Sequence, residues 1–236
     1  VLFRSDRLTS FLDSVLDRQI ANRVKFFIGV SGISEGSLKK RFHRLRIDST
    51  FVYNAISPSD CFPCQISRKS LPTNGRVTLG LVGTLEARKG HLFAIKVLST
   101  LKSRRAERVV IRFIGSDPFN FGDRIREEIR RLNLEADVEL AGFQPTHDLI
   151  YSDLDLVVIP SSENESFCFV AVEALGRGIP VVASSIGALP EILDRLPFCR
   201  VVASFDVQDW ATAIGNLLDE EDRKSTRLNS SHANIS

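Results

Sequence analysis

From Arg76 onward, short apolar runs alternate regularly with segments of helical periodicity, and this alternation constrains the fold more than any other feature of the sequence. The apolar runs are rich in Val and Ile and mostly continuous, as in strands that are buried on both faces of a parallel sheet. The pattern predicts strands at Val77–Val82, Val109–Ile114, Asp137–Leu140, Asp155–Ile159, Pro180–Ala183 and Cys199–Val202.

The segments between these strands carry apolar residues at i, i+3, i+4 and i+7. Ile125, Ile129 and Leu132 form one such stripe, with Arg and Glu on the opposite face. The predicted helices are Gly90–Ser103, Gly122–Leu132, Phe167–Gly176 and Val207–Leu218. Strands and helices that alternate in this way predict an α/β fold with a doubly wound, Rossmann-like parallel sheet.

The part of the chain that precedes this region has a different character. We predict that residues 6–60 are the end of a first α/β domain, that residues 61–75 form a Pro-rich linker, and that residues 76–221 form the second domain. Within the first domain we expect a strand at Val24–Val30, a helix at Leu38–Leu45 and a short strand at Phe51–Tyr53.

Both ends of the chain resemble translated adapter sequence from a sequencing library. Residues 1–5 read VLFRS and residues 222–236 read DRKSTRLNSSHANIS, and we set both aside from fold reasoning. The natural protein is then expected to extend beyond both ends. Without these segments, 27 basic and 28 acidic residues remain, so the charge balance gives no support for nucleic-acid binding.

Composition excludes several classes of protein. A chain with 43% hydrophobic and 25% charged residues is neither disordered nor collagen-like. No apolar run reaches the roughly 18 residues that a membrane-spanning helix needs. Four cysteines in 236 residues do not make a disulfide scaffold and indicate a reducing compartment. We therefore expect a cytoplasmic protein, either free or peripheral to the membrane.

Three loops that follow predicted strands hold most of the glycine and polar residues of interest. They span Gly83–Gly90, Pro160–Glu173 and Ser184–Glu191. Because parallel strands end at one edge of the sheet, these loops are expected side by side, each leading into a helix N-terminus. Helix N-termini offer unpaired N–H groups and positive partial charge, and Lys89 adds a full charge. The sequence thus predicts a phosphate or diphosphate site at this edge.

Four motifs in order give the chain a resemblance to a known family. They are Gly83–Gly90 (GTLEARKG), Pro160–Ala174 with Glu165 and Glu173, Gly178–Ser184 (GIPVVAS) and Gly187–Glu191 (GALPE). Over residues 24–218 the chain is similar to retaining glycosyltransferases of the GT-B fold, in the family called glycosyl transferases group 1. The resemblance covers the C-terminal, donor-binding half and the end of the N-terminal domain, which in this family binds the acceptor. The ordered set of motifs is much more specific than the paired glutamates alone.

The resemblance implies roles for the matching residues. Lys89 would neutralise the diphosphate leaving group, Glu165 would lie beside the transferred sugar, and Glu173 would accept hydrogen bonds from the ribose hydroxyls of a nucleotide sugar. Backbone amides around the start of the helix would hold the sugar or the distal phosphate. The expected catalytic residues are Glu165 and Lys89, and the expected donor-binding residues are Glu173, Thr84, Arg88, Phe167, Cys168 and Val170.

The implied function is transfer of a hexose-type sugar from a nucleotide-diphosphate sugar, with retention, to an unidentified glycan, lipid-linked or small-molecule acceptor. No metal or other cofactor is expected, because Lys89 and helix dipoles can take the charge that develops on the diphosphate. Two alternatives remain. One is a non-catalytic nucleotide-sugar-binding module, because Thr84 stands where the family often has Arg, and Ser166 and Cys168 stand where it often has Gly. The other is an epimerase or phosphorylase of the same fold.

Two further motifs and two histidines have simpler interpretations. Asp153 and Asp155 mimic a metal-binding D-x-D, but they directly precede a strand, so Asp155 is expected to be a strand-entry residue. The Cys61–Cys64 pair has no second cysteine pair and lies in the linker, which argues against a metal or redox site. His91 and His147 are expected at helix starts without a catalytic role.

We predict that the adapter-like ends contribute little to stability. A chain trimmed to residues 6–221 should melt at about the same temperature as the full 236 residues when both are followed by circular dichroism. A large fall in melting temperature on trimming would contradict the adapter interpretation.

Overall fold

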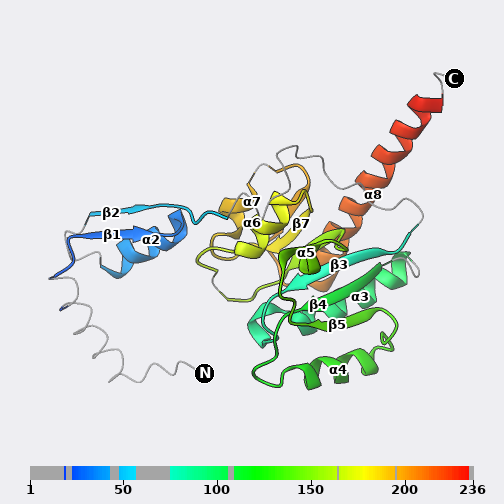
Figure 1. The fold of residues 1–236 in the computed structure, drawn as a ribbon, viewed down its shortest axis with the longest axis horizontal. Coiled ribbons are helices and arrows are strands. Elements are labelled where there is room, and N and C mark those ends of the chain that lie inside the picture. Colours follow the sequence, from blue (N-terminus) through cyan, green and yellow to red (C-terminus); the bar gives the residue numbers. More distant parts are fainter. Residues whose placement is uncertain are drawn as a thin grey trace. The chain divides into compact units, whose positions relative to one another are not determined.

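The computed structural model describes Gln19 and residues 23–42, 48–56, 75–105, 109–163, 165–194 and 196–233. Of the helix that ends the chain, side chains are described only as far as Glu220. The chain divides into two compact units, Val1–Ala55 and Ile56–Ser236, and each is described by itself (Figure 1). Most of the predicted linker, including Cys61 and Cys64, lies outside the described residues.

The second unit contains a six-stranded sheet in which all neighbouring strands are parallel. The strand order is β5-β4-β3-β6-β7-β8, so the chain starts in the middle, winds to one edge, and then returns past β3 to build the other half. This order confirms the predicted doubly wound sheet. The strands are β3 (Val77–Val82), β4 (Val109–Ile114), β5 (Val138–Gly142), β6 (Leu156–Ile159), β7 (Val181–Ser184) and β8 (Cys199–Val202).

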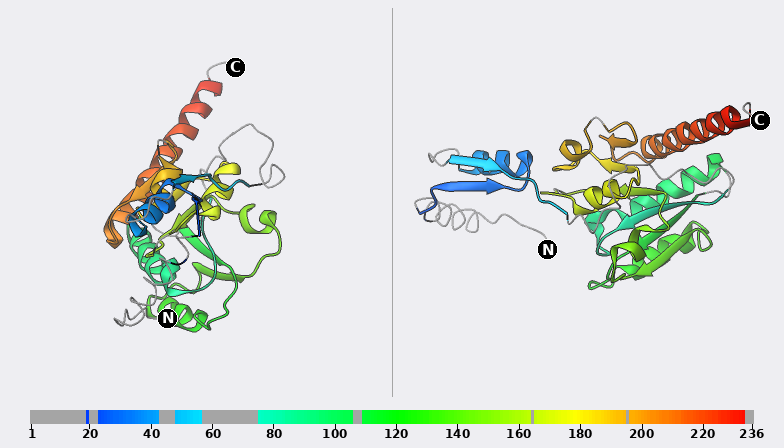
Figure 2. Two further views of the ribbon diagram at one scale, coloured as in Figure 1. Left: turned by 90° about the vertical axis from the view of Figure 1, so that its left-hand side faces the viewer. Right: turned by 45° about the horizontal axis from the view of Figure 1, so that its top comes forward.

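Helices cover both faces of this sheet (Figures 1 and 2). Residues of α3 (His91–Arg105), α4 (Gly122–Arg131) and α8 (Val207–Ala233) belong to one buried apolar cluster. Residues of α5 (His147–Tyr151), α6 (Phe169–Gly176) and α7 (Leu189–Leu193) belong to a second cluster. A short 3-10 helix, η2 (Ala87–Lys89), precedes α3.

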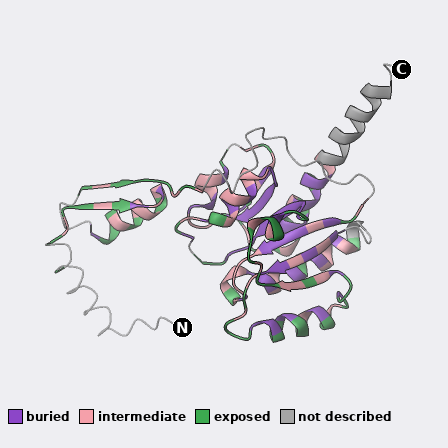
Figure 3. Ribbon diagram, viewed as in Figure 1, coloured by how far each residue is buried: buried purple, intermediate pink, exposed green. Residues whose placement is uncertain are grey.

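The strands supply alternate residues to the two clusters, and this explains their continuous apolar sequences. In β6, Leu156 and Val158 belong to the first cluster, whereas Val157 and Ile159 belong to the second. Because successive side chains of a strand point to opposite faces, a strand with helices on both sides must be apolar throughout. In Figure 3 the central strands β6 and β7 are buried throughout, whereas the outer strand β5 has no buried residue.

Local backbone geometry corrects several predicted helix bounds. The helix predicted from Gly90 begins at His91, because Gly90 adopts a left-handed φ of 77°. The helix predicted from Phe167 begins at Phe169, since Cys168 is extended and forms its N-cap. The last helix does not end near Leu218, and its backbone stays helical to Ala233, inside the adapter-like segment.

Buried acidic residues lie at the end of the sheet where the strands begin, opposite the three loops. Oδ2 of Asp155 accepts a hydrogen bond from the N–H of Thr78 at 2.9 Å and so links the starts of β6 and β3. Asp137, just ahead of β5, pairs with Lys102 and with Arg76. Asp155 is therefore a strand-entry residue as predicted, and Asp153 is an exposed neighbour of Arg112.

The first unit is a small β-α-β arrangement. Strands β1 (Phe26–Gly29) and β2 (Asp48–Phe51) are parallel, and α2 (Gly32–Arg41) packs against both. The helix predicted at Leu38–Leu45 begins earlier, because Ser31 caps it through a reciprocal pair of hydrogen bonds with Ser34. It ends at Arg41, and residues 43–45 of the prediction lie outside the described residues. The second strand lies slightly before the predicted Phe51–Tyr53, where pairing with β1 places it.

One face of this small sheet carries apolar side chains without cover from the described residues of its own unit. Gly29 closely approaches α2, and Phe27 stacks on Phe42 just beyond the helix. Phe26 and Ile28 alternate to the other face, where they are 49% and 63% exposed. Parallel sheets are normally covered on both faces.

Candidate functional site

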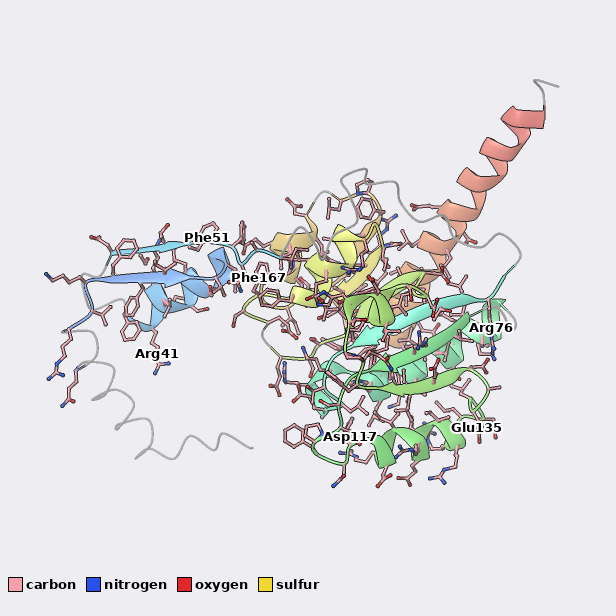
Figure 4. The ribbon with its side chains drawn as sticks, in the orientation of Figure 1. Arg41, Phe51, Arg76, Asp117, Glu135 and Phe167 are labelled. Carbon is pink, nitrogen blue, oxygen red and sulfur yellow. The ribbon has the colours of Figure 1, made fainter. Side chains whose placement is uncertain are left out.

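The predicted site residues gather where the strand order reverses. The loop after β3 carries Arg88 and Lys89, and the loop after β6 carries Glu165. These strands are neighbours in the sheet, but their following helices, α3 and α6, belong to opposite faces. Such a switch point leaves a crevice beyond the strand ends, where ligands of doubly wound sheets bind. In Figure 4, Phe167 lies at this side of the sheet, whereas Arg76 and Glu135 lie at the other.

A buried ion pair joins the two loops. Nζ of Lys89 donates to Oε1 of Glu165 at 2.6 Å, and Oγ of Ser161 donates to the same oxygen at 3.0 Å. The Lys89 and Glu165 side chains are only 15% and 11% exposed. A charge in such a position must be paired and hydrogen-bonded, as this carboxylate is. The arrangement holds an ammonium group at the mouth of the switch point.

A second cation reaches the same carboxylate. Nη1 of Arg88 lies 3.7 Å from Oε1 of Glu165, while Nη2 of Arg88 is 2.7 Å from Oε1 of Glu86. Its backbone carbonyl accepts the N–H of Ser162 at 2.8 Å. Arg88 is therefore anchored in its own loop and extends to the centre of the site, although position 84 holds Thr.

Close backbone approaches fix the three loops against one another. A Cβ on Gly90 would lie 2.2 Å from the carbonyl oxygen of Pro160, and a Cβ on Gly187 would lie 2.1 Å from that of Glu165. Both glycines have positive φ, so a side chain there would bring strain as well as a clash. The N–H of Ala188 donates to the Glu165 carbonyl at 2.8 Å, which joins the loop after β7 to the same point.

The loop after β3 passes directly beside the lysine. A Cβ on Gly83 would lie 3.5 Å from Cε of Lys89, so the aliphatic part of this side chain runs along the glycine. The neighbouring Thr84 is half-buried, and the N–H of Leu85 donates to the carbonyl of Ser116 beyond β4. Thr84 is thus close to Lys89 in the chain, but its side chain is not part of the ion pair.

The start of α6 presents backbone amides, while its cysteine faces the core. Cys168 is 3% exposed and belongs to the apolar cluster under α5, α6 and α7. Burial raises the pKa of its thiol to about 11, so it stays protonated and is a poor nucleophile or metal ligand. Phe167 contacts Phe169 edge to face at 5.2 Å, and Val170 is half-buried in the first turn. The first N–H groups of such a helix lack intrahelical acceptors.

Glu173 has a different set of partners from Glu165. Oε2 of Glu173 accepts a hydrogen bond from the Tyr151 hydroxyl at 2.6 Å, and Oε1 lies 3.6 Å from Nε2 of His147. Both partners come from α5, which crosses between β5 and β6. His147 therefore contacts a candidate site residue, although the sequence assigned it no role.

The structure thus separates the expected residues into two groups. Lys89, Arg88 and Glu165 form one charged cluster, and Glu173 belongs to a second cluster with α5. The backbone at Phe167 and Cys168 lies between the two glutamates in the chain. Sequence reasoning missed Ser161 and Tyr151 as partners. The signal for Ser161 was its place in the motif that opens the loop after β6, and a single Tyr in a short helix gave no signal for the second.

His91 lies buried directly behind the charged cluster. Its ring packs edge to face on Phe113 at 5.0 Å, and Nδ1 is 3.3 Å from the carbonyl oxygen of Glu86. Because a carbonyl can only accept, this contact requires a proton on Nδ1. Burial lowers the pKa of His91 from 6.5 to about 4. The imidazole is neutral near pH 7, as expected for a structural histidine.

Within the described ranges, no group of three or more His, Cys, Asp or Glu side chains is arranged to hold a metal ion. In the same part of the chain, no helix is both long and apolar enough to cross a membrane.

The fold of the chain is similar to that of several solved structures. Anabaena HepE in complex with UDP and glucose superposes with a TM-score of 0.72 and 24% identity, covering 86% of this chain and 56% of that one. Sucrose-phosphate synthase from Thermosynechococcus elongatus gives a TM-score of 0.67 and 21% identity, covering 89% of this chain and 59% of that one. At these identities the likeness concerns the fold.

The family follows from the sequence. Residues 65–233 match the sequence model of the family described as Glycosyl transferases group 1, and the chain belongs to that family. A D-inositol 3-phosphate glycosyltransferase of Corynebacterium aurimucosum is 35% identical over 159 residues, which is 65% of this chain and 37% of that protein. The Corynebacterium kroppenstedtii protein of the same name is 31% identical over 176 residues, 71% of this chain and 39% of that protein. The chain spans well under half the length of these relatives.

The buried histidine gives a pH-dependent prediction. Unfolding exposes His91, whose pKa then returns from about 4 to about 6.5, so the unfolded chain binds a proton that the folded chain does not. The contribution is fully present above pH 6.5 and is lost as pH falls toward 4, by about 3 kcal/mol in total. Urea denaturation between pH 7 and 4 should show that His91→Phe loses less stability than the unsubstituted chain. Parallel curves would contradict this assignment.

Proposed function

We propose that this chain is the donor-binding part of a glycosyltransferase that transfers a sugar from a nucleotide-diphosphate sugar with retention of configuration. The observation that carries the proposal is the Lys89–Glu165 pair, with Arg88 beside it, at the switch point of a group 1 glycosyltransferase domain. Retention is implied by the resemblance of the motifs to retaining GT-B enzymes.

The chemistry of the cluster suits this reaction. Breaking the bond between sugar and phosphate builds negative charge on the diphosphate, and preorganised donors aimed at that charge are usually the largest catalytic term. Lys89 and Arg88 would supply two cations, and the amides at the start of α6 would supply further donors. In this proposal the leaving group is stabilised without a metal ion. Glu165 would lie beside the transferred sugar.

A uridine nucleotide is the first donor to test. HepE has been solved with UDP and with UDP-glucose, and its fold matches this chain. This chain spans less than half of the D-inositol 3-phosphate glycosyltransferases. Their acceptor is therefore not carried over to it. We therefore propose a nucleotide-sugar donor and leave the acceptor as a glycan, lipid-linked or small molecule.

Two features support an active site over a module that only binds the donor. The Cys168 side chain is buried in the core, so the replacement of a small residue there places no thiol in the site. Arg88 approaches the carboxylate of Glu165, so a guanidinium is present although position 84 holds Thr. These observations weaken two of the three sequence-based reasons for expecting a non-catalytic module, and the third, the exposed Ser166, stands.

The first unit fits the proposal that it is the end of an acceptor-binding domain. Its two parallel strands carry α2 on one face and exposed Phe26 and Ile28 on the other. We infer that further elements of an α/β domain cover that face, because parallel sheets are covered on both sides. On this proposal the chain alone binds the donor nucleotide but transfers no sugar.

Removing the lysine should weaken nucleotide binding. Lys89→Ala deletes a hydrogen bond to a charged phosphate and should cost about 1.5–3 kcal/mol of binding free energy, measured with UDP by titration calorimetry. Lys102→Ala is a matched control, because Lys102 also pairs with a buried carboxylate, Asp137, but at the opposite edge of the sheet. An unchanged affinity of the Lys89→Ala chain would remove this residue from the site.

The two glutamates should behave differently. Glu173→Gln should weaken UDP and UDP-glucose alike, because both ligands carry the ribose. Glu165→Gln should leave UDP affinity nearly unchanged and weaken UDP-glucose, and in the full-length enzyme it should lower the transfer rate. If both residues were ordinary surface carboxylates, each change would stay within about 0.5 kcal/mol. Loss of UDP binding in Glu165→Gln alone would show that the two roles are assigned wrongly.

A further inference from the structure

Tyr151 forms a short hydrogen bond with Glu173, and the proposed function gives Tyr151 no role. The tyrosyl hydroxyl donates to Oε2 of the carboxylate at 2.6 Å. Tyr151 is 1% exposed and Glu173 has a side-chain exposure of 16%. The phenol is thus inside the domain, while the carboxylate is at the boundary between the core and the site.

The tyrosine can act only as a donor in this pair. Burial, together with the neighbouring Glu173 carboxylate, raises the pKa of the Tyr151 hydroxyl far above its usual value of 10. The phenol therefore keeps its proton near neutral pH and donates it to the Glu173 carboxylate. A buried Tyr whose O–H bonds to an ionised oxygen makes one of the stronger kinds of neutral–charged hydrogen bond.

The position of the phenol is fixed by packing. The guanidinium carbon of Arg177 lies 5.2 Å from the centroid of the Tyr151 ring, and Arg177 also pairs with Asp148 at 3.5 Å. Tyr151 also belongs to the apolar cluster that includes Cys168 and Leu154. A donor held in this way dictates where the Glu173 carboxylate lies.

The second carboxylate oxygen is left for another partner. Oε1 lies 3.6 Å from Nε2 of His147, which is beyond direct hydrogen-bond distance. A carboxylate with one oxygen bound from the core side presents the other oxygen in a defined orientation. Vicinal hydroxyls of a ribose are donors that such an oxygen can accept.

We propose that Tyr151 is a positioning residue that holds Glu173 for ribose recognition. The inference rests on the proposed role of Glu173 and adds the residue that orients it. Tyr151 itself does not touch the nucleotide. It acts by binding Oε2, so that the carboxylate need not be ordered when the nucleotide binds.

The test compares a ribose with a sugar that lacks its hydroxyls. Tyr151→Phe removes one oxygen and keeps the ring, and the variant chain should bind UDP about three- to tenfold more weakly in titration calorimetry. The variant and the unsubstituted chain should bind 2′,3′-dideoxy-UDP equally, because that nucleotide offers Glu173 no hydroxyl. In a Glu173→Gln background, Tyr151→Phe should have no further effect on UDP affinity. Lys102→Ala, whose site lies where the strands of the same sheet begin, is the control and should keep its UDP affinity.

The outcomes separate this inference from the proposed function. Equal weakening of UDP and dideoxy-UDP by Tyr151→Phe would show a general structural role and overturn the inference. Unchanged UDP affinity would overturn it too, while the donor site would stand. If the unsubstituted chain bound none of UDP, GDP or ADP, the proposed function would fail first and the inference with it. A melting temperature within a few degrees of the unsubstituted chain shows that Tyr151→Phe is folded.

Discussion

The position of the site depends on the reversal of strand order between β3 and β6. These two strands are hydrogen-bonded neighbours, yet their following helices belong to opposite faces of the sheet. The loops therefore diverge above the strand ends and leave room for side chains from both. Lys89 comes from one loop and Glu165 from the other, and their ion pair links the two loops. A different strand order with the same sequence motifs would have placed these residues apart.

Placing charges in such a position has an energetic cost that the local structure offsets. A buried carboxylate is tolerated only with donors around it, and Glu165 has Lys89, Ser161 and the more distant Arg88. The aliphatic part of Lys89 runs along Gly83. The buried, neutral ring of His91 is near enough to Lys89 to interact with it electrostatically. A protonated imidazole in that position would add a third positive charge to a crowded cluster. Its lowered pKa follows first from burial and keeps the charge balance of the cluster constant near pH 7.

The sequence predicted the structure best where apolar runs alternate regularly with segments of helical periodicity. The strands β3, β4 and β8 match their predicted bounds, because continuous apolar runs between helices have few alternative structures. The start of α2 was missed because Ser31 and Ser34 form a capping box without the usual acidic residue. The loop residues Lys89 and Glu165 could be placed at one sheet edge from spacing alone. Tyr151 could not be linked to Glu173, because their contact depends on how α5 packs against α6, and no local pattern encodes that.

The two glycine contacts have a consequence for how a ligand would be received. Gly90 packs on the carbonyl of Pro160 and Gly187 on that of Glu165, so three separate loops are locked together by backbone atoms. Little chain ordering then remains to be done when a ligand enters, and the loss of conformational entropy on binding is correspondingly small. The heat-capacity change of binding would be set by the surface that the ligand itself covers, without the larger negative value of coupled folding. Selection acting on these glycines would act on the thermodynamics of recognition, even though neither residue offers a side chain to the ligand.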